Sequence, residues 1–276
     1  MMTTSSSPFI IIVGPCILEG EHGAMNQETA KTLKSIVANF GNEIEFYFKS
    51  SFDKANRTSN SSYRGYGVQE GLDILKRIKE EVGVKLLTDI HAPEQAAQAA
   101  TVVDFLQIPA FLCRQTDLLV AAGETGLPIN VKKGQFLSPA ETQFCADKIK
   151  ATGNHNVFIC ERGTTFGYNN LVVDMRSFPI VKSLGLPMIF DATHSVQQPG
   201  GLNGKSGGNR DFAPLLARCA VVAGADGLFF ETHPKPHEAL SDGPNQIPLT
   251  WVEQLIGEAL SLRKVVAQQP AYVYAV

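Results

Sequence analysis

The chain has 276 residues, of which 44% are hydrophobic and 18% charged, and its formal net charge at pH 7 is −3. These values are ordinary for one globular domain with a large core, and a slightly acidic chain lacks the basic face that general nucleic-acid binding requires. No apolar run approaches the roughly 20 residues of a membrane span, and the five cysteines form no Cys-x-x-Cys pair. We therefore expect a cytoplasmic protein that binds neither nucleic acid nor membrane.

Eight short apolar runs follow one another along the chain, and each leads into residues that can do chemistry. A continuous apolar run bounded by turn residues is typical of a strand buried on both faces. The runs begin at Phe9, Ile44, Lys85, Phe105, Ile129, Val157, Met188 and Leu228.

Helical patterns lie between these runs. An apolar stripe predicts a helix from Val68 to Val82, ending at Gly83. Capping boxes at 138–141 and 250–253 predict helices that reach about Lys150 and Ala267, and residues 92–100 and 212–223 fill two further helical positions.

Repeated strand-then-helix units predict an α/β fold, a single-domain (β/α)8 TIM barrel with its active site at the carboxyl ends of the strands. We expect residues 9–276 to form this catalytic domain. Residues 1–8, which are rich in Ser and Thr and lack the basic start of a secretory signal, should form a disordered or loosely ordered tail.

Three connections, 52–67, 195–210 and 234–248, are longer than a compact barrel requires, and each follows a strand. Long ordered loops in a compact domain are usually functional. The middle one is rich in glycine, and we expect it to move as a lid. His233 and His237 belong to the Pro-rich third region, where we expect solvated rather than catalytic side chains.

Cationic residues collect at the strand ends. Barrel closure would direct them toward one mouth, where converging Lys and Arg side chains suit phosphate and carboxylate ligands. The alternative is that each side chain extends from the barrel rim into water. The set comprises Lys49, Lys54, Arg57, Arg114, Lys132, Lys133 and Arg162.

A second set of residues offers metal ligands. Cys16 follows the first strand, His194 the seventh, and Glu231 and Asp242 the eighth. These strands become neighbours when the barrel closes. A thiolate, an imidazole and two carboxylates suit one divalent transition metal such as Fe, Zn, Mn or Co. The alternative for Cys16 is a small buried packing residue.

Five stretches carry a resemblance to a known family: 48–59, 108–117, 130–136, 161–168 and 191–195. They closely resemble 3-deoxy-manno-octulosonate 8-phosphate synthases, and the similarity runs from about Phe9 to the final helix. The related shikimate-pathway synthase, which acts on erythrose 4-phosphate, has Lys-Pro-Arg-Thr where this chain has Lys-Ala-Asn-Arg at 54–57. That difference favours the octulosonate family.

The resemblance also bears on the metal. The family's metal-independent class has Asn where this chain has Cys16, so the chain resembles the metal-dependent class. The Gly243-Pro244 step after Asp242 is closer to the metal-independent pattern, which leaves the loop geometry at Asp242 open. Thr58 replaces the family's more usual Ser and keeps the hydroxyl.

By resemblance, the chain would condense phosphoenolpyruvate with D-arabinose 5-phosphate and water, giving 3-deoxy-D-manno-octulosonate 8-phosphate and inorganic phosphate for lipopolysaccharide precursor synthesis. It would act as a homotetramer in which a neighbouring subunit contributes to the sugar-phosphate site. The expected catalytic residues are Lys54, Asn56, Asp89, His194 and Asp242. The expected substrate-binding residues are Lys49, Lys54, Asn56, Arg57, Thr58, Gln107, Arg114, Lys132 and Arg162.

Alternatives remain at this point. Another phosphoenolpyruvate-using barrel synthase would act on a different aldose, and a non-catalytic sensor would bind phosphosugars without turnover. The sensor predicts losses among the strand-end residues, and the sequence has none. The sequence also leaves open whether the metal orients water or polarises the aldehyde.

Overall fold

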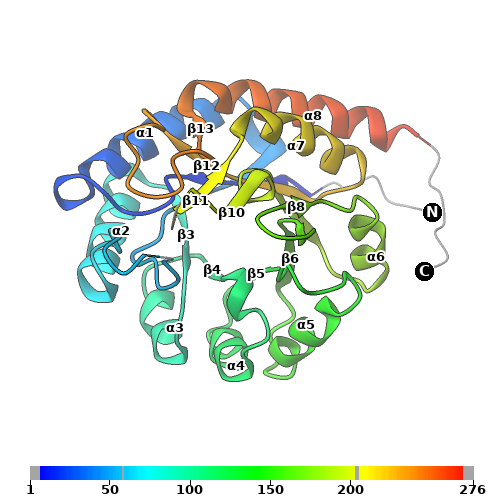
Figure 1. Ribbon diagram of the computed structural model, residues 1–276, viewed down its shortest axis with the longest axis horizontal. Helices are drawn as coiled ribbons and strands as arrows, with labels where there is room; N and C mark the ends of the chain where they lie inside the picture. Colours follow the sequence, from blue (N-terminus) through cyan, green and yellow to red (C-terminus); the bar gives the residue numbers. More distant parts are fainter. Residues whose placement is uncertain (1–6, 58, 203–204, 270–276) are drawn as a thin grey trace.

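The computed structural model describes residues 7–57, 59–202 and 205–269. Parallel strands close into a barrel in the order β1-β2-β3-β4-β5-β6-β9-β12, and β12 pairs back onto β1. This closure confirms the predicted (β/α)8 TIM barrel, seen end-on in Figure 1. The barrel strands are β1 (Phe9–Gly14), β2 (Ile44–Lys49), β3 (Lys85–Asp89), β4 (Phe105–Ile108), β5 (Ile129–Lys132), β6 (Val157–Glu161), β9 (Met188–Asp191) and β12 (Gly227–His233).

Helices surround the barrel as an outer ring (Figure 1). They are α1 (Ala24–Ala38), α2 (Val68–Val82), α3 (Pro93–Ala100), α4 (Thr116–Glu124), α5 (Thr142–Lys150), α6 (Ser177–Ser183), α7 (Ala213–Val222) and α8 (Val252–Ala267). Short 3-10 turns are η1 (Glu21–Gly23), η2 (Gly41–Glu43), η3 (Ala110–Leu112), η4 (His194–Val196), η5 (Arg210–Phe212) and η6 (Leu249–Trp251). Within the described residues, no helix is both long and apolar enough to cross a bilayer.

The two predicted capping boxes behave differently. The Ser138 box forms both of its reciprocal bonds, at 2.9 and 3.4 Å to Glu141, but it closes a turn just before α5 begins at Thr142. The Thr250 box forms no side-chain cap, because the turn η6 leads the chain into α8 instead.

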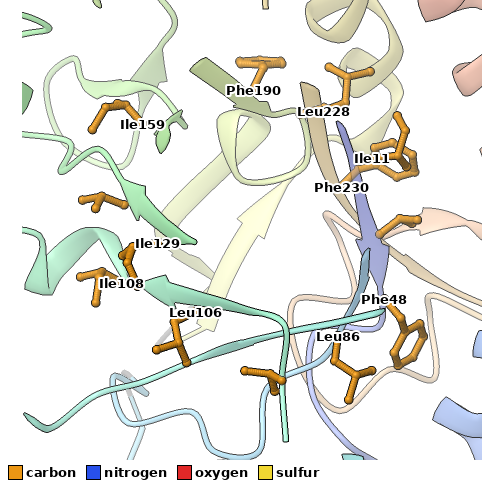
Figure 2. Packing of buried hydrophobic residues seen from close by; sticks show 14 of the residues in the cluster. Ile11, Phe48, Leu86, Leu106, Ile108, Ile129, Ile159, Phe190, Leu228 and Phe230 are labelled. Carbon is orange, nitrogen blue, oxygen red and sulfur yellow. The ribbon is translucent and has the colours of Figure 1, made fainter. Parts of the chain in front are cut away.

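The core has two layers, since successive strand residues point to opposite faces. One layer lies between barrel and helices and includes Ile11, Phe48 and Phe230, which Figure 2 shows among side chains from strands all around the barrel. The other fills the barrel interior and includes Ile10, Ile12, Phe105 and Phe229. Burying each such side chain contributes about 1.5–3 kcal/mol.

The three long connections lie at the carboxyl ends of the strands. The middle one contains an antiparallel hairpin, β10 (Gln197–Leu202) with β11 (Lys205–Gly208). The third includes β13 (Ile247–Pro248), which pairs with β12. A smaller hairpin, β7 (Thr164–Thr165) with β8 (Leu171–Val172), follows β6. Of the expected tail only Ser7 and Pro8 are described; residues 1–6 lie outside the described part of the chain.

Candidate active site

The carboxyl ends of the strands enclose a cavity of about 730 Å³. Strand register brings its residues together: Gly14 of β1 pairs with Glu231 of β12, and Asp89 of β3 with Gln107 of β4. Most of the predicted site residues line it. Those that do are Lys49, Lys54, Asn56, Arg57, Asp89, Gln107, Lys132, Arg162, His194, Glu231 and Asp242.

Three of the predicted metal ligands meet at one side of the barrel. The ligand atoms of Cys16, Glu231 and Asp242 all lie within 4.8 Å of one another. Cys16 Sγ lies 3.2 Å from Asp242 Oδ2, and Cys16 and Glu231 are fully buried. Closure of β1 against β12 is what joins residues more than 200 positions apart.

The fourth predicted ligand, His194, is adjacent to this group. Its Nδ1 lies 2.7 Å from Asp191 Oδ2, which leaves Nε2 free, 3.7 Å from Glu231 Oε2. That Glu231 oxygen is buried and has no hydrogen-bond partner in the part of the chain that the structure describes. A carboxylate on one ring nitrogen and a metal on the other is the usual arrangement for ligating histidines. Thiol, imidazole and carboxylates therefore fit a transition metal here.

The electrostatics of the cluster favour a bound cation. Burial, together with the charge of Glu231, raises the pKa of the Cys16 thiol well above its usual value. Burial also works to raise the pKa of Asp242, but the positive charges of His194 and Lys54 outweigh it and lower the pKa to about 2. A thiolate at Cys16 thus requires a positive partner that the protein alone does not supply.

Two of the cavity lysines form close ion pairs with acids. Lys49 forms a buried ion pair with Glu231, and Lys132 forms one with Asp191. The Lys132 ammonium also lies 3.3 Å from the centre of the Phe229 ring. Their charges are therefore compensated in part before any substrate binds.

A polar network extends along the cavity floor. Lys54 Nζ donates to Ser51 Oγ at 2.9 Å and lies 3.7 Å from Asp89, and Ser51 in turn donates to Asp89 at 2.5 Å. Gln107 also donates to Asp89. Burial works to raise the pKa of Asp89, but the charges of Lys54 and Lys49 hold it well below its usual range.

Of the three arginines that line the cavity, Arg210 donates to the backbone carbonyls of Gln246 and Gly243, whereas Arg57 and Arg162 are paired only in part. Arg162 Nη2 donates to Gln197 Oε1 at 2.9 Å, while its Nη1 is buried without a partner. Arg57 Nη1 donates to Ser241 Oγ at 2.8 Å, while its Nη2 is buried without a partner. Among the described residues neither guanidinium forms an ion pair with a carboxylate. Burial lowers the pKa of Arg162 from its usual value.

Four expected residues either do not line the cavity or lie outside the described chain, and the fully buried Cys16 is the first of them. Arg114 is exposed, because the turn η3 carries the chain outward before α4. Lys133, the first residue after β5, is buried and lies 3.5 Å from Glu161 instead of lining the cavity, so the expectation that it joins the mouth is wrong. Thr58 lies outside the described residues.

Sequence reasoning missed some neighbours of the site. Ser241 accepts from Arg57 and lies 2.9 Å from Cys16 Sγ, and Gln197 joins Arg162 to Asp242 by hydrogen bonds of 2.9 and 3.0 Å. Ser241 and Gln197 belong to two of the long connections that we expected to be functional. The length of these connections is the sequence feature that could have pointed to them.

The amino-acid sequence is similar over most of its length to proteins of one family. The model of the DAHP synthetase I family matches residues 1–264. A 2-dehydro-3-deoxyphosphooctonate aldolase of Desulfatibacillum aliphaticivorans is 51% identical over 258 residues, 94% of this chain and 93% of the relative. Proteins of the same name from Albidiferax ferrireducens and Acidithiobacillus ferrooxidans are 52% and 54% identical, covering 93% and 90% of this chain and 91% and 87% of the relatives.

Proposed function

The chain belongs to the DAHP synthetase I family, and we propose that it condenses phosphoenolpyruvate with D-arabinose 5-phosphate and water. The products are 3-deoxy-D-manno-octulosonate 8-phosphate, a lipopolysaccharide precursor, and inorganic phosphate. The shared name of the relatives, 2-dehydro-3-deoxyphosphooctonate aldolase, supports this product. The alanine-asparagine step at 55–56, where the erythrose-using synthase has Pro-Arg, supports the choice of sugar.

One observation carries the proposal: two guanidinium groups in one cavity each have a buried nitrogen without a hydrogen-bond partner among the described residues. Buried polar nitrogens normally have partners, so Arg57 and Arg162 point to ligands that bring acceptors. Arginine's fork suits phosphate and carboxylate. Two such sites fit two phosphorylated substrates. We assign Arg162 to phosphoenolpyruvate and Arg57, with the adjacent Asn56, to the sugar phosphate.

The chemistry then depends on positioning. Carbon 3 of the enol attacks the sugar aldehyde, water adds at carbon 2, and phosphate leaves the resulting hemiketal. Lys54 acts as a charged donor to the developing alkoxide, because Asp89 at 3.7 Å helps to keep it protonated. Holding two anions in one enclosed cavity supplies the proximity that the carbon–carbon bond requires.

The metal site is the second part of the proposal. Cys16, His194, Glu231 and Asp242 would hold one divalent transition ion, Fe, Zn, Mn or Co. Such an ion would supply Lewis-acid polarisation of the aldehyde or orientation of the attacking water. The hydrogen bond from Asp191 fixes which nitrogen His194 presents.

A cytoplasmic homotetramer completes the proposal, with residues 9–276 as its catalytic unit. Large apolar side chains are exposed in the loops after β4, β5 and β6, at Phe111, Phe136 and Phe166. Surfaces of this kind mark protein contacts when they are contiguous. Light scattering at micromolar protein concentration tests the subunit number.

The function is tested by phosphate release from phosphoenolpyruvate with three acceptors: arabinose 5-phosphate, erythrose 4-phosphate and N-acetylmannosamine. We expect arabinose 5-phosphate to give the highest specificity constant. Turnover on erythrose 4-phosphate equal to or above that value would overturn the choice of acceptor. Binding of phosphosugars without phosphate release would instead favour a sensor.

A further inference from the structure

A buried pair of ionisable side chains lies outside the cavity, and the proposed chemistry does not use it. Glu19 Oε1 lies 3.5 Å from His233 Nε2, a contact of charge type that meets no hydrogen-bond geometry, and the two side chains are 7% and 6% exposed. Neither residue lines the cavity. The sequence predicted a solvated His233, so this expectation is wrong, whereas His237 in the following loop is exposed as expected.

Hydrogen bonds to neighbouring residues hold both Glu19 and His233 in place. His233 Nδ1 accepts the N–H of Lys235 at 2.9 Å, which puts the ring proton on Nε2, facing Glu19. The N–H of Glu19 donates to Oδ1 of the buried Asn26 at 2.8 Å. The second carboxylate oxygen of Glu19 accepts the N–H of Leu240 at 3.2 Å.

The pair therefore joins three separate segments, and each carries a proposed metal ligand. Glu19 follows Cys16 by three residues, and His233 follows Glu231 by two. Leu240, whose amide donates to Glu19, precedes Asp242 by two. The segments come from the loop after β1, from β12 and from the loop after β12.

The loop after β12, which contains Asp242, requires stabilising contacts from other parts of the chain. Asp242 has a φ of +49°, in the left-handed region that non-glycine residues seldom adopt. Such a conformation costs roughly 1–3 kcal/mol and persists only where surrounding contacts determine it. The bond from Leu240 to Glu19 supplies one such contact just before the strained residue.

We infer that Glu19 and His233 are positioning residues that hold these three segments together, so that Cys16, Glu231 and Asp242 meet with the spacing a metal requires. The inference rests on the proposed metal site. It adds residues that touch neither substrate nor metal and act through the backbone of the ligand-bearing segments. Outer-shell partners of metal ligands typically change metal affinity by about 10–100-fold.

The test uses the metal-free full-length protein and Co²⁺ alone as the probe, with affinity measured by competition against a chromogenic chelator. Glu19→Ala should weaken Co²⁺ binding by about tenfold or more. Glu19→Gln, which keeps an oxygen for the Leu240 amide, should recover most of that loss. The matched control is Glu238→Ala, which removes an exposed acid from the loop that contains Leu240; within the described chain its ion-pair partners are Lys235 and His237. The control should leave the affinity unchanged.

Hydrogen exchange of the Leu240 amide gives a readout that does not depend on metal. Glu19→Ala should accelerate it in the metal-free protein, and Glu238→Ala should not. Unchanged exchange, or Co²⁺ affinity within about twofold of the unmodified protein, would overturn the inference. If the unmodified protein bound no Co²⁺ but Glu19→Ala still accelerated exchange, the metal proposal would fail while the positioning role stood.

Discussion

The two halves of the barrel interior are built from the same strands and hold opposite kinds of side chain. Toward the amino ends the interior is apolar, with Ile10, Ile12 and Phe105. Toward the carboxyl ends it holds buried charges, among them Lys132 and Asp191. Apolar burial stabilises the fold directly, whereas a buried ion pair contributes little net stability after desolvation. The amino half therefore maintains the barrel, and the carboxyl half maintains a site.

Removing the metal should affect the carboxyl half alone and gives the largest expected effect. A chelator should abolish activity, because it removes the cation that the Cys16 thiolate needs: without it, burial and the charge of Glu231 raise the pKa of the thiol. Mn, Co, Fe or Zn should restore activity to different degrees. Cys16→Asn should lose the response to chelator. Full activity in protein holding less than about 0.1 equivalent of metal by elemental analysis would contradict the metal site.

Phe105→Ala should instead destabilise the apolar half of the barrel interior, toward the amino ends of the strands. Phe105 packs against Tyr47 and Phe158, with ring centres 5.1 and 5.2 Å away. Its truncation should lower the free energy of unfolding by about 3–5 kcal/mol. Urea unfolding monitored by circular dichroism measures this, and Phe105→Leu serves as the milder control. A loss below about 1 kcal/mol would mean that the interior layer does not maintain the barrel.

Arg162→Ala should separate activity from stability. The specificity constant should fall roughly 100-fold or more, because a buried charge-assisted contact to phosphate is worth about 3 kcal/mol. Arg162→Lys should recover only part of this, since lysine lacks the fork. The unfolding free energy should hardly fall, because the loss of the hydrogen bond from Nη2 to Gln197 is offset by removal of a buried charge whose Nη1 has no partner among the described residues. A near-normal Arg162→Ala enzyme would contradict the assigned role.

Arg114→Ala is the contrast to Arg162→Ala. The Arg114 side chain is exposed and lies outside the cavity of its own chain. If the chain acts alone, its loss should change the specificity constant by less than about tenfold. A loss as large as that of Arg162→Ala would show that Arg114 reaches the site of a neighbouring subunit, as the expected homotetramer requires.

Acid should weaken the carboxyl half by a smaller amount. The depressed pKa of Asp89 means that its contribution to stability is complete above its unfolded pKa of about 3.9 and is lost as pH falls toward the folded value. The unfolding free energy should therefore drop between about pH 4 and pH 2, and Asp89→Asn should reduce that slope by about one proton. Urea titrations across this range measure it, and an identical slope would be the contrary result.

Much of the fold could be predicted because periodicity is local. Each of the eight apolar runs became a barrel strand, and the helix ending at Gly83 ends there in the structure with the glycine at φ +69°. The order of strand and helix units then leaves few topologies, since parallel strands require crossovers. The same closure argument predicted the ligand set. Cys16, Glu231 and Asp242 do come together, and His194 lies beside Glu231, while their binding of a metal stays a prediction.

What the sequence alone determined is which residues stand at the strand ends; only the tertiary structure decided which way each one faces. Lys132 and Lys133 are adjacent and chemically identical, yet one lines the cavity and the other is buried beside Glu161. His233 ends β12 and His237 lies four residues further on, yet only His233 is buried against an acid. The physical reason is that side-chain direction depends on strand pleat and on partners distant in sequence, such as Glu19, which composition and spacing do not encode.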